Sequence, residues 1–325
     1  MSFHQSYLAA TLGRRPALEG RLATLRGSKI FVSGASGIVG LAVSNVLEYV
    51  GAKVVAHSRE PYAGALALTG RAVDWIHGDL ASAIGTAGQF DYTFHCATFG
   101  QPEKFSRAWR ETIGLNVDVL LRLLDVSQKL GFASTSEIYS GISEPGQESM
   151  NGCTTPQHPR SGYIEAKRLG EAICFHSGRA VANRIALASG PYPKPDDSRA
   201  IYQIIRRAKH DGYVSLQGGG GNVRQYQYSF ACALRFIVST CFGSQPVYNN
   251  AGPYLLSMRD LAAAIASSMR LDFRGGDEGE GLAGAPSLVR VDTSRIRNEF
   301  PELDGVDPSL NAFVDAIVEA AHAYA

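Results

Sequence analysis

Short apolar runs alternate with longer helical stretches over the first part of the chain, and no other feature of the sequence constrains the fold as strongly. Runs with strand character cover residues 29–33, 53–57, 74–77, 92–97, 132–136 and 182–188. Helical stretches between them cover residues 39–49, 109–130 and 163–177. Because parallel strands need long crossover connections, this alternation is typical of βαβ units. The pattern predicts an α/β fold with a doubly wound parallel sheet.

The alternation ends near residue 189. Pro191, Pro193 and Pro195 crowd together there, and a helix is expected at 200–209, followed by a hairpin turn at the glycine run 218–221. Two further helices, 257–269 and 307–324, are expected on either side of a glycine-rich loop at 275–286. Such a shift in composition marks a different substructure. We therefore expect a smaller C-terminal lobe over residues 189–325.

The first 27 residues are rich in arginine and contain one acid, Glu19. Apolar side chains recur on or near one helical face at Leu8, Leu12, Leu18, Leu22 and Leu25. This spacing predicts an amphipathic N-terminal helix that packs against the main domain. An organelle transit peptide is the alternative, because those segments are also rich in arginine and poor in acids.

The overall composition excludes several classes of protein. The chain of 325 residues has 31 Lys+Arg and 30 Asp+Glu, so its net charge of +1 gives no positive field for nonspecific nucleic-acid binding. No apolar stretch reaches the roughly 18 residues that a membrane-spanning helix needs. Five scattered cysteines without a CxxC pair argue against a disulfide framework and against zinc, and indicate a reducing compartment, the cytoplasm. The histidines lack metal-ligand spacing, so no metal site is predicted.

A glycine-rich turn, Gly34-x-x-Gly37-x-x-Gly40, directly follows the first expected strand and opens a helix. Glycines at such a turn let the backbone approach a pyrophosphate, and the amides of the helix N-terminus meet its charge. The strand before the turn and the helix after it favour dinucleotide binding. A tight turn required only by packing is the alternative.

Tyr163 and Lys167 form a YxxxK pair on a later expected helix. Residues four apart share one helical face, so the ammonium group can lie beside the phenol hydroxyl. A nearby cation favours the phenolate, and we expect it to lower the pKa of Tyr163 toward neutral pH and make the residue a general base.

Together, GxxGxxG and YxxxK resemble the extended short-chain dehydrogenases/reductases, the NAD(P)-dependent nucleotide-sugar epimerase/dehydratase family. The segment STSEIY matches the strand end where these enzymes place a catalytic Ser or Thr, here Thr135. The resemblance implies a Rossmann-type sheet with a dinucleotide-binding domain at 28–188, preceded by the helical extension 1–27. The remaining residues, 189–325, would form mainly the substrate-binding lobe, interleaved with late strands of the sheet. The cofactor contacts that it implies are Gly34, Ser36, Gly37, Ile38, Val39, Gly40, Asp79, Leu80, Cys96, Ala97, Asn116, Tyr163 and Lys167.

Within this family the stretch from Ser134 to Tyr228 most resembles the UDP-glucuronate decarboxylases (UDP-xylose synthases). The matching pieces are STSEIY, YIEAKRLGEAIC, RIALASGP, DDSRAI and RQYQY. The resemblance places Glu137 beside the sugar as a catalytic acid/base and Ser136 in the substrate site. It also implies that Arg199 and Arg224 contact a sugar carboxylate or the diphosphate, which the planar guanidinium can hold through two hydrogen bonds.

Several positions depart from the pattern of the family. Leu187 stands where an asparagine usually holds the diphosphate, and Ala231 replaces a typical aspartate. NAD-binding members usually have an acid at the end of the second strand to accept from the ribose hydroxyl. This chain has Ser58 and Arg59 instead, which could bind the extra 2′-phosphate of NADP. We therefore favour NADP over NAD, although Arg59 could also stack on the adenine.

The resemblance implies oxidation at carbon 4 of a nucleotide-linked sugar through Tyr163, Lys167 and Thr135. Epimerisation or decarboxylation and return of the hydride would follow. Ser136 replaces the aspartate of the Asp-Glu pair found in dehydratases, which makes dehydration less favoured. An NADPH-dependent one-way reductase of a ketosugar or other carbonyl is the alternative. A dinucleotide sensor without turnover is a third reading, disfavoured by the intact proton-transfer residues. Relatives commonly dimerise through the helices that match 109–130 and 163–177, so a homodimer is expected.

Overall fold

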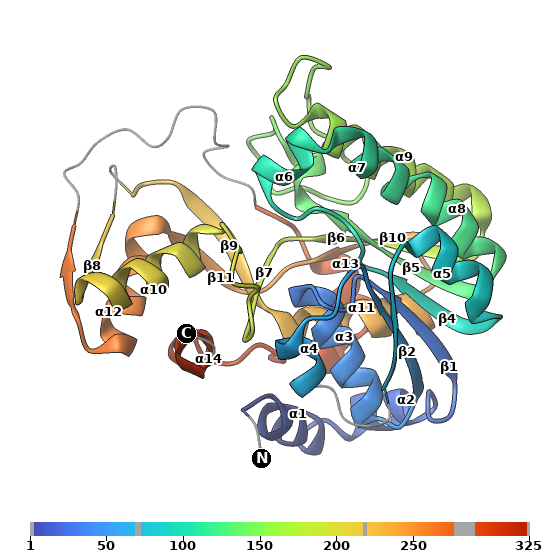
Figure 1. Ribbon diagram of the computed structural model, residues 1–325, viewed down its shortest axis with the longest axis horizontal. Helices are drawn as coiled ribbons and strands as arrows, with labels where there is room; N and C mark the ends of the chain where they lie inside the picture. The colour runs from blue at the N-terminus through green and yellow to red at the C-terminus, as the bar shows by residue number, and fades with distance from the viewer. Residues whose placement is uncertain (1–2, 69–72, 217–219, 276–289, 324–325) are drawn as a thin grey trace.

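The computed structural model describes residues 3–68, 73–216, 220–275 and 290–323. It confirms the Rossmann-type α/β class, with a seven-stranded parallel sheet in the order β10-β6-β5-β4-β1-β2-β3 (Figure 1). The strands of this sheet are β1 (Lys29–Ser33), β2 (Lys53–Ser58), β3 (Val73–His77), β4 (Phe90–His95), β5 (Ser127–Thr135), β6 (Ala180–Ile185) and β10 (Val247–Asn250). The strand order changes direction between β1 and β4, and ligands of doubly wound sheets bind outside the carboxyl ends at such a point.

Helices cover both faces of the sheet and enclose two apolar cores. α3 (Ile38–Tyr49) packs on α11 (Ser229–Phe242) on one face. On the other face lie α5 (Leu80–Ala87), α8 (Asp118–Asp125) and α9 (Ser161–Ser177), with α7 (Trp109–Asn116) packed on α9. Two short helices, α4 (Ala63–Leu68) and α6 (Pro102–Arg107), follow β2 and β4, and the 3-10 turn η1 (Ser136–Tyr139) follows β5. The carboxyl ends of the strands thus meet at one edge.

The sequence misplaced two elements of this half. The helix expected over 109–130 is two helices, α7 and α8, and its last residues belong to β5, where Ser127 pairs with Phe90. Helix α11 was not expected at all. Almost every residue of α11 is buried, so its sequence lacks the polar face that reveals an amphipathic helix.

The C-terminal lobe contains two small sheets, a three-stranded one in the order β11-β9-β7 and a parallel pair β12-β8 (Figure 1, left). The strands are β7 (Leu187–Ser189), β8 (Tyr213–Ser215), β9 (Val223–Tyr228), β11 (Tyr254–Ser257) and β12 (Asp272–Arg274). The helices of this lobe are α10 (Ala200–Asp211), α12 (Met258–Met269) and α14 (Leu310–Ala323), whereas α13 (Ser294–Glu299) packs on β10 and η2 (Pro301–Leu303) packs on α2 in the other half. β8 and β9 join different sheets, so the hairpin expected between them is wrong; residues 217–219 and nearly all of the expected loop 275–286 lie outside the described residues.

The N-terminal segment packs on the main domain, as its leucines predicted, but as two helices, α1 (Phe3–Gly13) and α2 (Pro16–Ala23). All the predicted leucines from Leu8 to Leu25 are buried. Tyr7 donates a hydrogen bond of 2.6 Å to the carbonyl of Val306, and Arg21 pairs with Glu302 at 2.7 Å. Across the described parts of the chain, no helix has the length and apolar character needed to span a membrane.

Candidate functional site

The glycine turn joins β1 to α3 at the carboxyl edge of the sheet. Gly34 has a φ of +68°, and a Cβ at this position would lie 2.6 Å from the backbone nitrogen of Ala97. A Cβ on Gly40 would lie 2.4 Å from the carbonyl oxygen of Gly34. Both glycines are therefore required by the tight packing of the turn against the neighbouring strand and helix.

The same turn fits the diphosphate of a dinucleotide. Gly37 is the N-cap residue of α3 and has no side chain to bind the amides of the first turn, Ile38, Val39 and Gly40. A Cβ on Gly37 would meet only the carbonyl oxygen of Gly34, at 3.3 Å, so its outer side is open. Uncapped amides with a positive helix end favour an anion. Ser36, also predicted here, is buried in this turn.

A buried histidine holds the end of β4 against the turn. The hydroxyl of Ser33 and Nδ1 of His95 are hydrogen-bonded at 2.6 Å, and Nε2 of His95 bonds the carbonyl of Leu115 at 2.7 Å. Burial lowers the pKa of His95 to about 3, so the ring is neutral. The amide of Ala97 donates to the hydroxyl of Ser33 at 3.3 Å. Cys96 and Ala97, which the sequence analysis named as cofactor contacts, thus lie beside Gly34.

The predicted adenine-side residues have unequal freedom to bind. Ser58 donates its hydroxyl to the carbonyl of Glu60 at 2.8 Å and bonds Nδ1 of His77 at 3.0 Å. Arg59 is exposed, and its guanidinium lies 5.4 Å from the ring centre of Phe99. A 2′-phosphate could therefore reach Arg59 directly, whereas Ser58 already has internal partners.

Three other predicted cofactor residues also have internal contacts. Asp79 caps α5 and accepts hydrogen bonds from Ser82, which lower the pKa of its carboxyl group. Leu80 is buried in the core below the sheet. Asn116 donates to the carbonyl of Thr112 at 2.7 Å, and its buried Oδ1 has no hydrogen-bond partner among the described residues. Asn116 therefore keeps one acceptor for a ligand or for water.

Tyr163 and Lys167 lie one turn apart on α9, facing the end of β5. The ammonium of Lys167 donates to the carbonyl of Ala133 at 2.5 Å and lies 5.7 Å from the ring centre of Tyr163. The hydroxyl of Thr135 hydrogen-bonds the phenol of Tyr163. The structure therefore brings together the three residues that the sequence proposed for proton transfer.

The protonation of this group differs from the expectation. Burial raises the pKa of Tyr163 above its usual 10, with a further contribution from the nearby Glu137 carboxylate, and this outweighs the hydrogen bond from Thr135. Burial also lowers the pKa of Lys167 to about 7. The cation that was expected to stabilise the phenolate is thus itself disfavoured by the apolar surroundings.

A charged cluster lies beside Tyr163. Arg160, just before α9, donates to Oε1 of Glu137 at 2.8 Å, while the buried Oε2 of Glu137 has no partner among the described residues. Arg224 on β9 is close enough for both groups to affect its charge, and burial lowers the pKa of Arg224. The sequence analysis missed Arg160; its place three residues before Tyr163 was the available signal.

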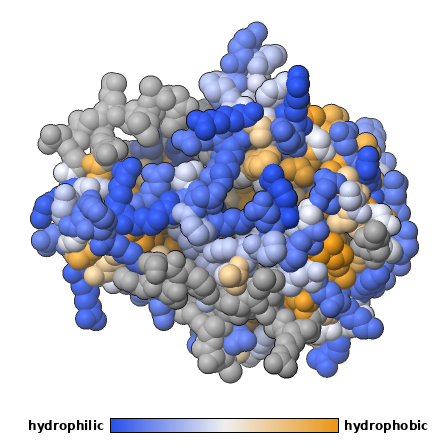
Figure 2. Space-filling view, in the orientation of Figure 1, coloured by the Kyte–Doolittle hydropathy of each residue, from blue (hydrophilic) through white to orange (hydrophobic). Residues whose placement is uncertain are grey.

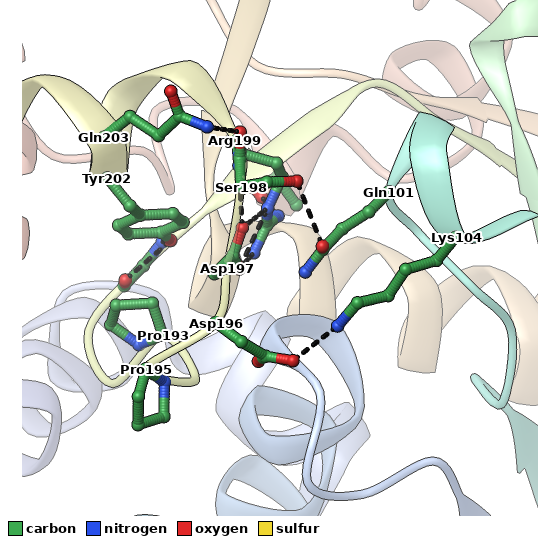
Figure 3. Close-up of polar contacts among 12 residues, drawn as sticks. Gln101, Lys104, Pro193, Pro195, Asp196, Asp197, Ser198, Arg199, Tyr202 and Gln203 are labelled. Carbon is green, nitrogen blue, oxygen red and sulfur yellow. Dashed lines mark hydrogen bonds and ion pairs between the residues drawn. The ribbon is translucent and has the colours of Figure 1, made fainter.

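The other predicted substrate residues differ in their contacts. Arg199 forms a fork with Asp197, with its Nε 3.0 Å from Oδ1 and its Nη2 2.5 Å from Oδ2, and donates to the carbonyl of Ala188 (Figure 3). To bind a substrate, Arg199 would have to leave Asp197. Ser136 lies in η1 beside Glu137 and is half-buried. Leu187, at the position usually taken by asparagine, is 40% exposed on β7.

Among the residues that the structure describes, no group of three or more His, Cys, Asp or Glu side chains could hold a metal ion. All five cysteines carry free thiols. The ionisable groups gathered at the end of β5 are the phenol of Tyr163, the ammonium of Lys167, the carboxylate of Glu137 and the guanidinium groups of Arg160 and Arg224.

Comparison with known proteins gives one family match. The family described as "NAD dependent epimerase/dehydratase family" matches residues 30–236. UDP-glucuronic acid decarboxylase 4 of Arabidopsis thaliana is 24% identical, over 90% of this chain and 72% of that protein. UDP-glucuronic acid decarboxylase 1 of Xenopus tropicalis is 26% identical over 43% of this chain, and the match spans only 36% of that protein.

Solved structures with the same fold include several sugar-nucleotide epimerases. UDP-N-acetylglucosamine 4-epimerase from Methanobrevibacter ruminantium superposes with a TM-score of 0.77 at 20% identity, covering 92% of this chain and 100% of that one. UDP-glucuronic acid 4-epimerase from Bacillus cereus, solved with UDP-glucuronic acid and NAD, gives 0.75 at 19% identity, covering 91% and 100%. At this level of identity the likeness shows the fold.

Proposed function

The chain belongs to the NAD dependent epimerase/dehydratase family, and on this premise we propose that it modifies a nucleotide-linked sugar through oxidation at carbon 4. The membership confirms the predicted enzyme class and its dependence on a nicotinamide dinucleotide. The proposal is supported above all by one observation: Thr135, Tyr163 and the Glu137–Arg160 pair converge at the end of β5.

The first step of the proposed mechanism is proton transfer to Tyr163. A nicotinamide dinucleotide held at the turn from Gly34 to Gly40 would supply the hydride acceptor for this oxidation and the hydride donor for its reversal. Thr135 would orient the carbon 4 hydroxyl, and Tyr163 in its phenolate form would accept the hydroxyl proton; a ketone is left at carbon 4 when the C–H bond breaks and its hydride passes to the acceptor. Lys167, whose ammonium is held by the carbonyl of Ala133 at 5.7 Å from the ring centre of Tyr163, would favour the phenolate when it is protonated.

The ketone makes the neighbouring carbon 5 acidic. Glu137 has one oxygen fixed by Arg160 and a second, buried oxygen free to exchange a proton at that carbon. If a carboxylate is attached there, the bond to it can break, carbon dioxide leaves, and the electron pair moves toward the ketone. A proton then returns to carbon 5, and Tyr163 returns its own proton to the oxygen on carbon 4 when the hydride comes back. The cycle is redox-neutral.

Arg224 would bind the anionic part of the substrate. Among the residues that the structure describes, its guanidinium donates only to the carbonyl of neighbouring Val223, at 2.9 Å. Burial lowers its pKa, so a bound anion would stabilise the charged form.

The test uses UDP-glucuronic acid carrying deuterium at carbon 4, incubated with the purified enzyme and NAD. We expect a product that has lost carbon dioxide or changed configuration and retains the deuterium, read by mass spectrometry and NMR. A matched Tyr163→Phe variant should form neither product. Equal product formation by this variant would overturn the proposal.

Two observations favour the alternative, a one-way reductase of a carbonyl substrate. Burial raises the pKa of Tyr163, so the phenol holds its proton near neutral pH, as a reductase needs for donating it to a developing alkoxide. The exposed Arg59 also suits the 2′-phosphate of NADPH. Consumption of NADPH in equal amount to a 4-ketosugar, without deuterium retention in the first assay, would favour this reading.

We also propose that the enzyme is a homodimer that uses α7, α8 and α9. Large apolar side chains are exposed on these helices, with Trp109 at 50% and Phe175 at 62%, beside Ile113, Leu121 and Leu169. Figure 2 shows that apolar atoms reach the surface mainly in this half of the molecule. Such patches mark protein interfaces. Light scattering should give twice the mass of the chain, and Leu169→Glu should reduce the measured mass to that of one chain.

The free thiols agree with a location in the cytoplasm.

A further inference from the structure

Phe105 lies face to face on the ring of Tyr163. The two ring centres are 4.4 Å apart and the ring planes differ by 9°. Both side chains are buried, with exposed fractions of 2% and 9%. Parallel rings with centres at this distance are offset-stacked, an arrangement that aromatic pairs prefer, so the contact itself favours this orientation of the phenol ring. Phe105 therefore restricts the plane in which the phenol can lie.

Phe105 belongs to α6, a helix of six residues that depends on its neighbours. Two side chains of this region reach the segment between β7 and α10 in the C-terminal lobe (Figure 3). The ammonium of Lys104 lies 2.6 Å from Oδ2 of Asp196, and the hydroxyl of Ser198 donates to Oε1 of Gln101 at 3.0 Å. The stack on Tyr163 is thus connected to the lobe that would hold the sugar.

The segment that receives these contacts is itself held at several points. Arg199 pairs with the carboxylate of Asp197. Arg206 of α10 donates to the carbonyl of Pro195 at 3.1 Å and also to the carbonyl of Asp197. The hydroxyl of Tyr62 donates to the carbonyl of Pro193 at 2.9 Å. Because these bonds hold the 193–198 segment in place, its contacts with Lys104 and Gln101 can hold α6 in place.

We propose that Phe105 is a positioning residue for Tyr163, and that Lys104 and Gln101 transmit the position of the 193–198 segment to it. The inference rests on the proposed function in one respect, the role of Tyr163 in proton transfer. It assigns a catalytic consequence to contacts far from the reacting atoms: a shift of the C-terminal segment would move α6 and turn the phenol.

The surroundings of the phenol predict what the loss of the stack would do. A hollow of about 290 Å³ borders both rings, with Trp109 and Pro159 among its lining residues, so a smaller side chain at 105 would admit water. Glu137, Arg160 and Lys167 are the charged groups that face Tyr163, and a change at 105 alters none of them. Since burial raises the pKa of Tyr163, added water should lower it.

The first experiment compares Phe105→Leu with Phe105→Tyr, which keeps an aromatic face. Displacement of a reacting group by about 1 Å can cost up to about 10²-fold, so we expect Phe105→Leu to lower kcat by roughly 10- to 100-fold with little change in KM. Phe105→Tyr should keep most of the wild-type kcat. Equal effects of both variants, or a change in KM alone, would contradict a positioning role.

A second measurement needs no substrate. In protein with carbon-13-labelled tyrosine, the NMR signal missing from Tyr163→Phe identifies Tyr163, and its titration midpoint can be followed in each variant. We expect the midpoint to move to lower pH in Phe105→Leu and to stay near the wild-type value in Phe105→Tyr. An unchanged midpoint in Phe105→Leu, in a protein that remains folded, would overturn the inference.

The link to the C-terminal lobe is tested by Lys104→Met, Asp196→Asn and the double variant. We expect each single variant to lower kcat a few-fold and the double variant to be no worse than either one, because both remove the same contact. Arg107→Met, an exposed cation on the same helix, is the control and should behave as wild type. Additive losses, or no loss, would overturn the proposed connection.

These outcomes separate this inference from the proposed function. If Tyr163→Phe keeps its turnover, the proposed function fails, whereas the NMR midpoints still decide whether Phe105 positions the phenol. If Tyr163→Phe loses turnover while Phe105→Leu keeps both its kcat and its midpoint, only the role of Phe105 fails.

Discussion

The seven-stranded sheet and the C-terminal lobe contribute to the candidate site in different ways. In the sheet, functional groups follow the ends of β1, β4 and β5 or lie on α9, so the backbone places them. In the C-terminal lobe the two predicted arginines have different partners: Arg199 is bound to Asp197, whereas Arg224, within the described part of the chain, donates only to the carbonyl of neighbouring Val223. The positions of the site residues in the sheet half thus follow from backbone geometry. In the C-terminal lobe, the pairing of side chains decides which arginine can contact a ligand.

The largest effect should come from Tyr163, at the centre of the sheet half. Tyr163→Phe removes the proton-transfer group, and we expect turnover of UDP-glucuronic acid with NAD to fall by roughly 10²- to 10⁴-fold. Tyr49→Phe, an exposed tyrosine at the end of α3, should keep full turnover. If the two variants are equally active, the sheet edge is not the reaction site.

Lys167 allows a test by stability alone. Burial lowers its pKa from 10.5 to about 7, so between these values the unfolded chain binds a proton that the folded protein has released. The free energy of unfolding should therefore rise with pH across this window, and Lys167→Met should lose that part of the rise. Urea unfolding at pH 7 and pH 9 measures it, with the exposed Lys53→Met as control. Identical pH slopes in wild type and Lys167→Met would contradict the burial argument.

The two arginines sharpen the comparison within the C-terminal lobe. Arg199→Met leaves the Asp197 carboxylate without its fork, and we expect the free energy of unfolding to fall by roughly 2–3 kcal/mol. Arg224→Met should instead raise the KM of the nucleotide sugar by roughly 10- to 100-fold and leave stability almost unchanged. Urea unfolding and initial-rate kinetics on both variants measure the difference. The opposite assignment of effects would mean that Arg199 leaves Asp197 to bind the substrate.

The smallest effect concerns Arg59, the residue of the sheet half whose proposed contact with the dinucleotide depends on its side chain and not on the backbone. Arg59→Met should reduce the preference for NADPH over NADH by about tenfold, the change expected from the loss of one charge-assisted contact. Fluorescence titration with each dinucleotide measures this ratio, and Arg122→Met, an exposed arginine on α8, serves as control. Tighter binding of NADH by the wild-type protein would overturn the proposed role of Arg59 and favour a recycled NAD.

The predictability of the fold follows from how each element is buried. The strand starting at Lys29 and the helix ending at Tyr49 were placed correctly because their patterns are local. The helix expected over 109–130 was wrong because its last residues continue the sheet beside Phe90, and no local signal separates a buried strand from a buried helix there. The same reason explains why the buried α11 was missed.

The candidate site was partly visible before the structure. Tyr163 and Lys167 were identified by their spacing and Thr135 by the family resemblance of STSEIY, and the structure brings the three together. Arg160 was missed because an arginine in a loop carries no pattern, and its meaning comes from the bond to Glu137. The expected fall in the pKa of Tyr163 was wrong because spacing shows which groups are near but not how much water reaches them.

By itself, the sequence determined the parallel α/β sheet, the glycine turn and the placement of Tyr163 and Lys167 on one face of α9. These features depend on short-range periodicity and on backbone conformations that few residues allow. Only the tertiary structure decided which arginine is free, which groups are desolvated, and that Phe105 stacks on Tyr163 while its helix contacts Asp196. Burial and charge pairing depend on neighbours that are distant in the chain, so no local pattern contains them.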